Sequence, residues 1–380
     1  MLPKLLNQRT SPKPSVGLPE KIKKIEDDIH RTQVNKKTEH HVGLLRAKLA
    51  KLRAEMEEQQ TRKSGSRPGF DIKKSGDATV VLIGLPSVGK STLLNRLTNA
   101  KSKVAAYQFT TLEVVPGVME HGGAKIQVLD LPGIIKGASS GKGLGRRVLA
   151  VARSADLVLF IVDVFQPEAR ELLERELRST GIRVDEAPPN VLIEEVDSGG
   201  ISVAAQVKMT RMSEGLVKDI LRIYDINGAR VVIRQDIDDQ QLVDVMSGNR
   251  VYVPSLTVMN KIDLVNTGFT TELTRKLPYS FVPVSAEAGV NIQALKEEIY
   301  RRLDFVRIYM RRRTGETDFE EPMVVRGGAT IADICDKVHR GMRDEFRYAQ
   351  VWGKSVKFAG QRVGMTHRLM DQDVLTIITR

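Results

Sequence analysis

A glycine loop carries the residues whose types and spacing could do chemistry in this chain. It consists of Gly84-Leu85-Pro86-Ser87-Val88-Gly89-Lys90-Ser91-Thr92. β-Branched and aliphatic residues at 79–83 predict a buried strand before the loop, and leucines at 93, 94 and 97 have helical spacing after it. A strand, a glycine loop and a helix in this order are typical of phosphate-binding loops. An ordinary glycine turn followed by a chance Lys-Ser pair is disfavoured, because both flanking elements are present.

The residue types in this loop suit a nucleoside triphosphate. Backbone N–H groups must surround the anion without side-chain obstruction, which Gly84 and Gly89 permit, and the following helix offers its positive N-terminal end. Lys90 would reach the β- and γ-phosphates as a catalytic residue, and the Ser91 hydroxyl would ligate Mg²⁺. We expect nucleotide contacts from Gly84, Pro86, Ser87, Val88, Gly89, Lys90, Ser91 and Thr92.

A second group of residues would face the γ-phosphate and the metal. The predicted strand 125–130 ends in Asp130-Leu131-Pro132-Gly133, where Asp130 suits an outer-shell Mg²⁺ position and the Gly133 N–H suits the γ-phosphate. Upstream, Tyr107-Gln108-Phe109-Thr110-Thr111 offers a threonine as a second Mg²⁺ ligand. Four glycines at 137–145 predict a mobile loop that could switch with the nucleotide. Taken alone, 130–133 could be a plain Pro-Gly turn, and Thr110-Thr111 could be a chance pair of threonines.

A third group has the residue types that read a guanine base. A predicted strand at 255–260 ends in Asn260-Lys261-Ile262-Asp263. The Asp263 carboxylate would accept from the guanine N1–H and the exocyclic amine, a donor pair that adenine lacks. Asn260 would hold the loop and reach the ring, while the Lys261 stem covers the base. Ser285-Ala286, after a strand at 281–284, would offer a backbone N–H to the guanine oxygen.

Alternating strand and helix patterns surround these groups and predict a doubly wound, mostly parallel α/β domain. We place this nucleotide domain at 76–310, with a small α/β insertion at about 181–248. Within the insertion, 191–196 and 201–203 predict a β-hairpin. Two basic amphipathic helices in residues 1–75 predict a hairpin that docks on the next domain or on a partner. A small mixed sheet with one helix, expected beyond Pro322 within 320–380, predicts a β-grasp binding module.

Composition narrows the class of protein. The 380 residues are 41% hydrophobic and 28% charged, and the longest apolar runs are too short to cross a bilayer. Cys335 is the only cysteine and the first twenty residues contain no apolar signal core, so we expect a cytoplasmic protein. Residues 1–75 hold 18 Lys/Arg against 9 Asp/Glu, or +9 of the formal +12. This surplus favours a polyanionic partner such as RNA, although a solvated basic face would have the same composition.

Four motifs stand in order, at 84–91, Thr111, 130–133 and 260–263, and together they resemble a translation-factor-type GTPase. Three further features narrow the resemblance to the Obg superfamily, and within it to the developmentally regulated GTP-binding protein (DRG) family. They are the stretch 107–111, the glycine loop 137–145 and the insertion. Two C-terminal runs, 326–330 and 348–355, are similar to that family's TGS domain. The resemblance covers about residues 20–380.

The resemblance carries expectations of its own. It implies GTP/GDP as ligand with Mg²⁺, Thr111 rather than Thr110 as the metal-sensing residue, and catalytic roles for Lys90, Thr111 and Gly133. Many GTPases have a water-orienting glutamine where this chain has Ile134, so intrinsic hydrolysis should be slow or use another group. Relatives that recruit K⁺ often have asparagine where this chain has Ser87, which leaves potassium dependence open.

The partners implied are the ribosome or translation machinery bound to rRNA or tRNA, with an accessory regulatory protein, no membrane and a monomeric chain. Two functions remain open on the sequence: a ribosome-linked GTP hydrolase that acts as a switch, and an RNA- or ribosome-docking module that nucleotide merely stabilises. An ATP-dependent enzyme such as a kinase is disfavoured by Asp263 and by the absence of a base for a substrate hydroxyl.

Overall fold

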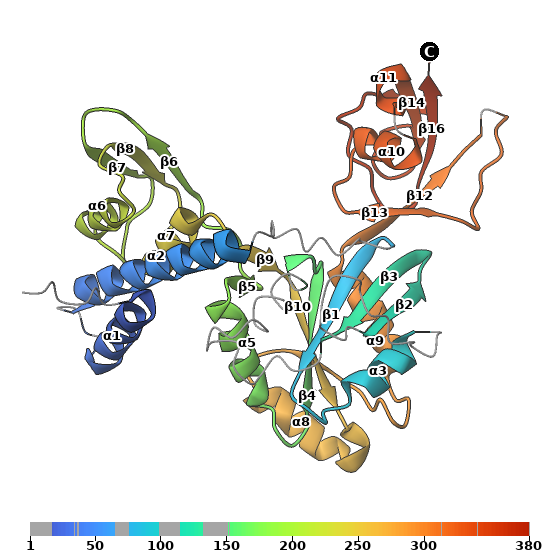
Figure 1. Cartoon of the computed structure of the whole chain (residues 1–380). Coiled ribbons are helices and arrows are strands. Elements are labelled where there is room, and N and C mark those ends of the chain that lie inside the picture. Colours follow the sequence, from blue (N-terminus) through green and yellow to red (C-terminus); the bar gives the residue numbers. More distant parts are fainter. Residues whose placement is uncertain are drawn as a thin grey trace, which may run out of the picture. The chain divides into compact units, whose positions relative to one another are not determined.

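A computed structural model of the chain describes residues 17–33, 35, 38–64, 76–98, 115–131, 151, 153–312, 314–339 and 341–379. The chain divides into two compact units (Figure 1). Unit 1 combines the described part of Met1–Gly69 with Ala187–Arg250, and unit 2 combines the described part of Phe70–Glu186 with Val251–Arg380. Among the described helices, none is both long and apolar enough to cross a membrane.

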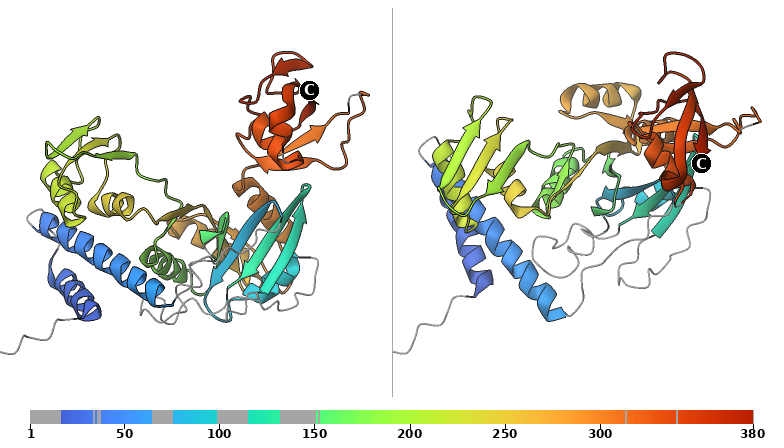
Figure 2. Two further views of the ribbon diagram at one scale, coloured as in Figure 1. Left: turned by 45° about the horizontal axis from the view of Figure 1, so that its top comes forward. Right: turned by 90° about the horizontal axis from the view of Figure 1, so that it is seen from above.

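Unit 2 contains a six-stranded sheet in the order β11-β10-β4-β1-β3-β2. Every neighbouring pair is parallel except β2 and β3, which form an antiparallel hairpin at one edge (teal in Figure 2). The elements of this part are β1 (Ala78–Gly84), α3 (Lys90–Leu97), β2 (Val115–His121), β3 (Ala124–Asp130), β4 (Leu157–Asp163), α5 (Ala169–Ser179), β5 (Ile182–Val184), β9 (Val251–Val253), β10 (Ser255–Asn260), η1 (Ile262–Leu264), α8 (Thr267–Lys276), β11 (Phe281–Pro283) and α9 (Ile292–Arg302).

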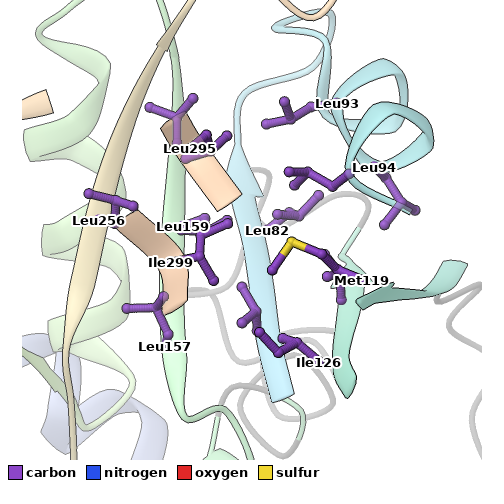
Figure 3. Close-up of a cluster of buried hydrophobic side chains, with 14 of the residues drawn as sticks. Leu82, Leu93, Leu94, Met119, Ile126, Leu157, Leu159, Leu256, Leu295 and Ile299 are labelled. Carbon is purple, nitrogen blue, oxygen red and sulfur yellow. The ribbon is translucent and has the colours of Figure 1, made fainter. Parts of the chain in front are cut away.

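Both faces of this sheet are buried, as the continuous apolar runs of its strands predict. On one face, Leu82 and Leu159 pack with leucines of α3 and with Leu295 and Ile299 of α9 (Figure 3). On the other face, the alternate residues of β1, β4 and β10 pack against α5 and α8. Helices on both faces make the sheet doubly wound, which confirms the predicted fold class.

The ends of the insertion meet inside unit 2. The predicted start of the insertion, at about residue 181, is too early, because β5 belongs to unit 2 and the insertion spans Ala187–Arg250. Strand β5 precedes it and β9 follows it, and the two pair in parallel with Ile182 opposite Val251. Ile182, Val184 and Val253 contribute to the core on the α5 face. The chain therefore leaves and re-enters this unit at adjacent points.

Unit 1 is built from the insertion and the N-terminal helices. Its elements are α1 (Leu18–Arg31), α2 (Glu39–Ser64), β6 (Val191–Glu195), β7 (Ile201–Ala205), α6 (Glu214–Ile223), β8 (Ala229–Ile233) and α7 (Asp239–Ser247). The predicted β-hairpin of 191–196 with 201–203 is wrong, because β8 lies between the two strands, antiparallel to β6 and parallel to β7. The linker 196–200 is long enough to open that gap, and β8 has the apolar residues for a central position: Val231 and Ile233 are almost fully buried.

Helix α2 has two packing faces where the sequence predicts one apolar stripe. Val42 and Leu45, on the predicted stripe, are buried, and α1 packs against α2. Ala47, off the stripe, is fully buried in the core formed by α6, α7 and the three strands. A Cβ at Gly43 would lie 3.1 Å from Leu216 of α6, so small residues let the insertion approach α2 closely. The helical hairpin thus docks on the insertion.

The C-terminal part of unit 2 is a five-stranded mixed sheet in the order β13-β12-β16-β14-β15. Its elements are β12 (Phe305–Met310), β13 (Met323–Arg326), α10 (Ile331–Val338), α11 (Met342–Glu345), β14 (Phe346–Trp352), β15 (Gln361–Val363) and β16 (Asp373–Thr379). One face of the sheet packs on Ile331, Ile334 and Cys335 of α10. Strands β12 and β15 were not among those predicted. The expectation that the module's sheet begins beyond Pro322 is therefore wrong, since β12 pairs in parallel with β16.

Two neighbouring leucines of α5 test the buried core. Leu173 is fully buried between α5 and the sheet, whereas Leu172 is 39% exposed. Leu173→Ala should lower the free energy of unfolding by about 2–5 kcal/mol, because it removes buried methyl groups and leaves a cavity. Leu172→Ala, the same change one residue away, should cost less than about 1 kcal/mol. Urea titration of the nucleotide-free chain measures both, and equal costs would contradict the burial of Leu173.

Candidate nucleotide-binding site

The sheet brings the predicted groups to one edge. Strands β1, β3, β4 and β10 are parallel, so their carboxyl ends lie together. In register, Leu82 lies opposite Asp130 and Asn260 opposite Asp163. In sheets of this type, ligands bind in the crevice outside the carboxyl ends, where the strand order reverses. Here β3 and β4 lie on opposite sides of β1, which places that crevice directly after Gly84.

The phosphate loop has a backbone that leaves no room for additional side chains. Gly89 has φ 91°, a left-handed conformation, and a Cβ there would lie 2.4 Å from Asn260 Nδ2. A Cβ at Gly84 would lie 2.5 Å from the Ile161 carbonyl oxygen. Helix α3 begins immediately after Gly89, so its unpaired N-terminal N–H groups point toward the loop. The loop therefore has the shape and the donors of an anion cradle.

Three polar side chains meet below this loop. The Lys90 ammonium donates to the carbonyl oxygens of Gly84 (3.0 Å) and Leu85 (3.1 Å). The Ser91 hydroxyl donates to Asp130 Oδ2 at 2.9 Å. Burial lowers the pKa of Lys90, and the Asp130 carboxylate opposes that shift. An ammonium that follows the glycine loop directly is placed to contact a phosphate.

Asp130 has an unsatisfied buried oxygen. The residue is only 4% exposed, and its Oδ1 has no hydrogen-bond partner among the described residues. Leaving a buried carboxylate oxygen unpaired is costly, and such atoms in native sites commonly await an ion or water. The donors at this point are all oxygen: the Ser91 hydroxyl and a carboxylate. Hard oxygen donors are those that Mg²⁺ prefers.

Asn260 links the phosphate loop to the predicted base loop. Its amide Nδ2 donates to the Val88 carbonyl oxygen at 2.8 Å, and its Oδ1 accepts from the Ala286 N–H at 2.9 Å. The side chain is buried, with the residue 2% exposed. These two bonds hold together loops that are 198 positions apart in the sequence. This is the geometry required of a residue that holds the loop.

The remaining base-reading residues surround this link. Lys261 has φ 66°, and its ammonium pairs with Asp163 Oδ2 at 2.7 Å, which fixes the end of its side chain. Asp263 lies in η1 with an exposed side chain. Ser285 and Ala286 are buried; the Ser285 hydroxyl accepts from the Ala288 N–H.

The structure thus places most of the predicted residues at one edge of the sheet. Described there are Gly84, Pro86, Ser87, Val88, Gly89, Lys90, Ser91, Thr92, Asp130, Asn260, Lys261, Asp263, Ser285 and Ala286. Thr111, Gly133, Ile134 and the glycine loop 137–145 lie outside the described residues.

Two residues that support this site were not predicted. Asp163 ends β4 beside Asn260 and orients Lys261, and it also accepts from the Phe165 N–H. Arg96 of α3 donates to the carbonyl oxygens of Ala286 (3.0 Å) and Glu287 (2.6 Å), which holds the base loop against α3. Asp163 had a sequence signal, since an aspartate ends a buried strand there. Arg96 had none, because its partners are backbone atoms.

Comparisons with known proteins agree with this arrangement. A model of the 50S ribosome-binding GTPase family matches residues 79–195, one for the C-terminal region of the same domain matches 198–305, and a TGS domain model matches 306–379. An uncharacterized GTP-binding protein of Methanocaldococcus jannaschii is 50% identical over 96% of this chain and 94% of its own length. Developmentally-regulated GTP-binding protein 2 of Homo sapiens is 46% identical over 96% of this chain and 100% of its own.

Among solved structures, the YchF GTPase of Schizosaccharomyces pombe covers 80% of this chain and 99% of its own, with 12% identity and a TM-score of 0.42, which is too low to support an argument. The fold, the site and the family matches define a P-loop GTP-binding protein with a C-terminal TGS domain. The chain belongs to the developmentally regulated GTP-binding protein family of the Obg superfamily.

The Asn260 link should contribute to stability even without nucleotide. Asn260→Ala leaves the Val88 carbonyl and the Ala286 N–H unpaired, which should lower the free energy of unfolding by about 1–3 kcal/mol. Urea titration of the nucleotide-free chain measures this. Asp263→Asn is the matched comparison, because the Asp263 side chain is exposed and its replacement should leave that free energy unchanged.

Asp263→Asn should instead act on ligand choice. The amide replaces an acceptor with a donor, which mismatches guanine and matches the oxygen at position 2 of xanthine. Removal of a charge-assisted pair should weaken GTP binding at least about tenfold and favour xanthosine triphosphate. Titration calorimetry with both nucleotides measures the change, and Glu272→Gln on α8 is the control for removal of one surface charge. Unchanged GTP affinity would remove Asp263 from the base site.

Proposed function

We propose that this protein is a Mg²⁺-dependent GTPase that acts as a molecular switch in association with ribosomes. The observation that carries the proposal is the cluster of Lys90, Ser91 and Asp130 under the phosphate loop, with Asp130 Oδ1 buried and unpaired among the described residues. A bound metal or its water would satisfy that oxygen. The ammonium and the N-terminus of α3 would neutralise the phosphates beside it.

The metal would be held by few protein groups, as is usual for Mg²⁺. Ser91 would supply an inner-sphere hydroxyl and Thr111 a second, while Asp130 would bind a coordinated water in the outer shell. Mg²⁺ held there would supply positive charge that neutralises the phosphates. The Gly133 N–H would contact the γ-phosphate, so the segment after Asp130 would sense whether that phosphate is present.

Guanine selectivity is attributed to Asp263. Its side chain is exposed, and no ion pair or hydrogen bond engages it among the residues that the structure describes. A carboxylate held by its backbone in η1 and without a competing partner is available to accept two donors from the base. The Asp163–Lys261 pair keeps the Lys261 side chain near it. The N–H that was predicted to contact the guanine oxygen is engaged in this structure, because Ala286 donates to Asn260 Oδ1 and Ser285 donates to the Val290 carbonyl oxygen.

We propose slow intrinsic hydrolysis. Ile134 stands where a water-orienting glutamine would, and an aliphatic side chain cannot orient water. Lys90, Thr111 and Gly133 would stabilise charge on the transferred phosphoryl group, but they do not activate water. A factor that supplies the missing group, whether K⁺ admitted beside Ser87 or an accessory protein, would raise the rate.

The ribosome is the partner that we propose, and the cytoplasm the location, for a chain that is itself monomeric. The matching GTPase family is described as 50S ribosome-binding, and the surplus of +9 in residues 1–75 suits a polyanion. The alternative is a nucleotide-stabilised docking module with negligible turnover. A GTPase assay with and without purified ribosomal subunits separates the two, because a switch should turn over faster with subunits and a docking module should not.

Lys90→Ala should abolish GTP turnover in that assay and leave the chain folded. Within the described residues the Lys90 ammonium donates only to two loop carbonyls, so its removal should cost no more than about 1–3 kcal/mol and leave the chain folded. Circular dichroism checks the fold, and Lys276→Ala on α8 is the control for removal of one lysine. Parental turnover in a folded Lys90→Ala chain would exclude the phosphate loop from the reaction.

The basic N-terminal helices should set the salt dependence of ribosome binding. Lys23, Lys24 and Lys48 are exposed on α1 and α2. Replacing all three with glutamine should reduce the log–log salt slope by about 0.7–0.9 for each phosphate that these lysines neutralise, and should leave GTP affinity unchanged. Deleting residues 1–60 is a poorer test, because it removes Ala47 from the core of unit 1. Sedimentation across potassium chloride measures the slope, and an unchanged slope would mean that these lysines are only solvated.

A further inference from the structure

The outer face of the C-terminal sheet carries a cluster of stacked arginine and aromatic side chains. We call it the arginine–aromatic face and define it as Arg311, Arg347, Tyr348, Trp352 and Arg362. Arg347 and Arg362 are exposed, and the other three are half-buried. The face lies wholly within the TGS domain, on the opposite side of the sheet from α10.

Strand register establishes which side chains share this face. Ala349 and Val351 of β14 point into the core against α10 and are fully buried. Side chains alternate along a strand, so Tyr348 and Trp352 point the other way. A register shift between Phe346 and Tyr348 interrupts the alternation at Arg347, whose guanidinium lies beside the Tyr348 ring. Gln350, between them, pairs with Arg362 of β15. The outward positions of β14, β15 and β16 are therefore Tyr348, Gln350, Trp352, Arg362, Val374, Thr376 and Ile378.

Each ring on this face lies under a guanidinium. The Arg311 Cζ lies 4.5 Å from the Trp352 ring centroid, and the Arg362 Cζ lies 4.7 Å from that of Tyr348. A second arginine, Arg347, lies 6.0 Å from the Tyr348 centroid. The electron-rich face of an aromatic ring attracts a guanidinium, so these contacts hold the arginine side chains beside the rings.

The face is positively charged. None of its seven outward strand positions is Asp or Glu, and Asp373, the acidic residue of β16, is fully buried. The turn that follows Trp352 adds exposed Lys354 and Lys357 and an exposed Phe358. No carboxylate on this face pairs with its three arginines among the described residues, so their charge is available to an anion.

We propose that the arginine–aromatic face binds single-stranded RNA by stacking bases on its planar side chains while the arginines and lysines contact the phosphates. Flat aromatic and guanidinium surfaces recognise unpaired bases, and a neighbouring basic groove follows the backbone. Gln350 offers both a donor and an acceptor to a base edge at the centre of the face. The inference names the RNA-contacting residues of the proposed ribosome-associated function and rests on that function for the choice of RNA.

An acidic protein segment is the competing occupant. Carboxylates use the charge and the paired N–H donors of an arginine but gain nothing from rings beneath it. Bases gain from the planes themselves. An RNA strand and an acidic protein segment can therefore be told apart by whether binding needs only the positive charge of this face or also its planar side chains.

The single tryptophan of the chain provides a direct reporter, because Trp352 is the only one. Titrating the GDP-bound full chain with an oligoadenylate of about ten nucleotides should change the Trp352 emission in a saturable way. Oligoglutamate of equal charge should change it little. A flat emission trace with RNA, or an equal change with oligoglutamate, would overturn the proposal.

Conservative variants separate stacking from charge. Arg362→Ala should weaken oligoadenylate binding about 5- to 100-fold, and Arg362→Lys should fail to restore it, because lysine keeps the charge without the plane. Full rescue by lysine would show that charge alone matters and would overturn stacking. Trp352→Phe should retain most of the affinity, as measured by anisotropy of a labelled oligonucleotide. Arg343→Ala on α11 removes the same charge away from the face and should leave affinity unchanged.

The outcome is distinguishable from that of the GTPase proposal. A chain that hydrolyses GTP with ribosomal subunits but gives no tryptophan response would leave the switch intact and exclude this face. A chain that binds oligoadenylate yet shows no turnover with subunits would support the face and contradict the switch.

Discussion

The two hydrogen bonds of the Asn260 amide are the interaction on which the rest of the site depends. They join the Val88 carbonyl of the phosphate loop to the Ala286 N–H of the base loop from the end of a central strand. Because the amide is buried and both bonds are short, neither loop can shift without leaving a polar group unpaired. Gly89 must lack a side chain for this reason, since a Cβ there would collide with Nδ2. One side chain thus sets the separation between the phosphate and base halves of the site.

The chemistry of the phosphate half follows from burial. Lys90 and Asp130 both lie under the loop, where charge is poorly solvated, and the lowered pKa of Lys90 shows the cost of burying its ammonium. An anion above and a cation beside Asp130 Oδ1 would offset that cost in both groups. An anion and a cation bound together would therefore stabilise this pair of buried charges more than either ligand alone. In the C-terminal sheet, too, charged side chains are held in place by a neighbour, since the guanidinium groups of Arg311 and Arg362 lie over aromatic rings.

Local patterns were enough to predict much of this structure from the sequence. Buried strands with an aspartate or asparagine at the tip, as at Asp130 and Asn260, show in one stretch both the element and the residue at the sheet edge. The packing of segments that are far apart in the sequence was not predictable from such local patterns. The insertion of β8 between β6 and β7 depends on which strand buries more apolar surface, and the second face of α2 depends on Ala47, a residue type with little pattern of its own. Likewise, the contact of Arg96 with the base loop was not predictable, because Arg96 donates to a backbone carbonyl oxygen and every residue type has one.

The parallel pairing of β5 with β9 has a consequence for how this chain could have been assembled. Parallel strands always require a crossover connection, and here the crossover is the whole of Ala187–Arg250 together with the edge residues on either side. The entropic cost of closing such a connection grows only with the logarithm of its length, by about 0.6 kcal/mol for each doubling. A short crossover could therefore be exchanged for one with a core of its own at little thermodynamic cost, and the register of the six-stranded sheet would not change. Between Val184 and Val251, a nucleotide-binding domain could therefore acquire an inserted domain, with a new binding surface, while the sheet edge that carries its nucleotide site stays unchanged.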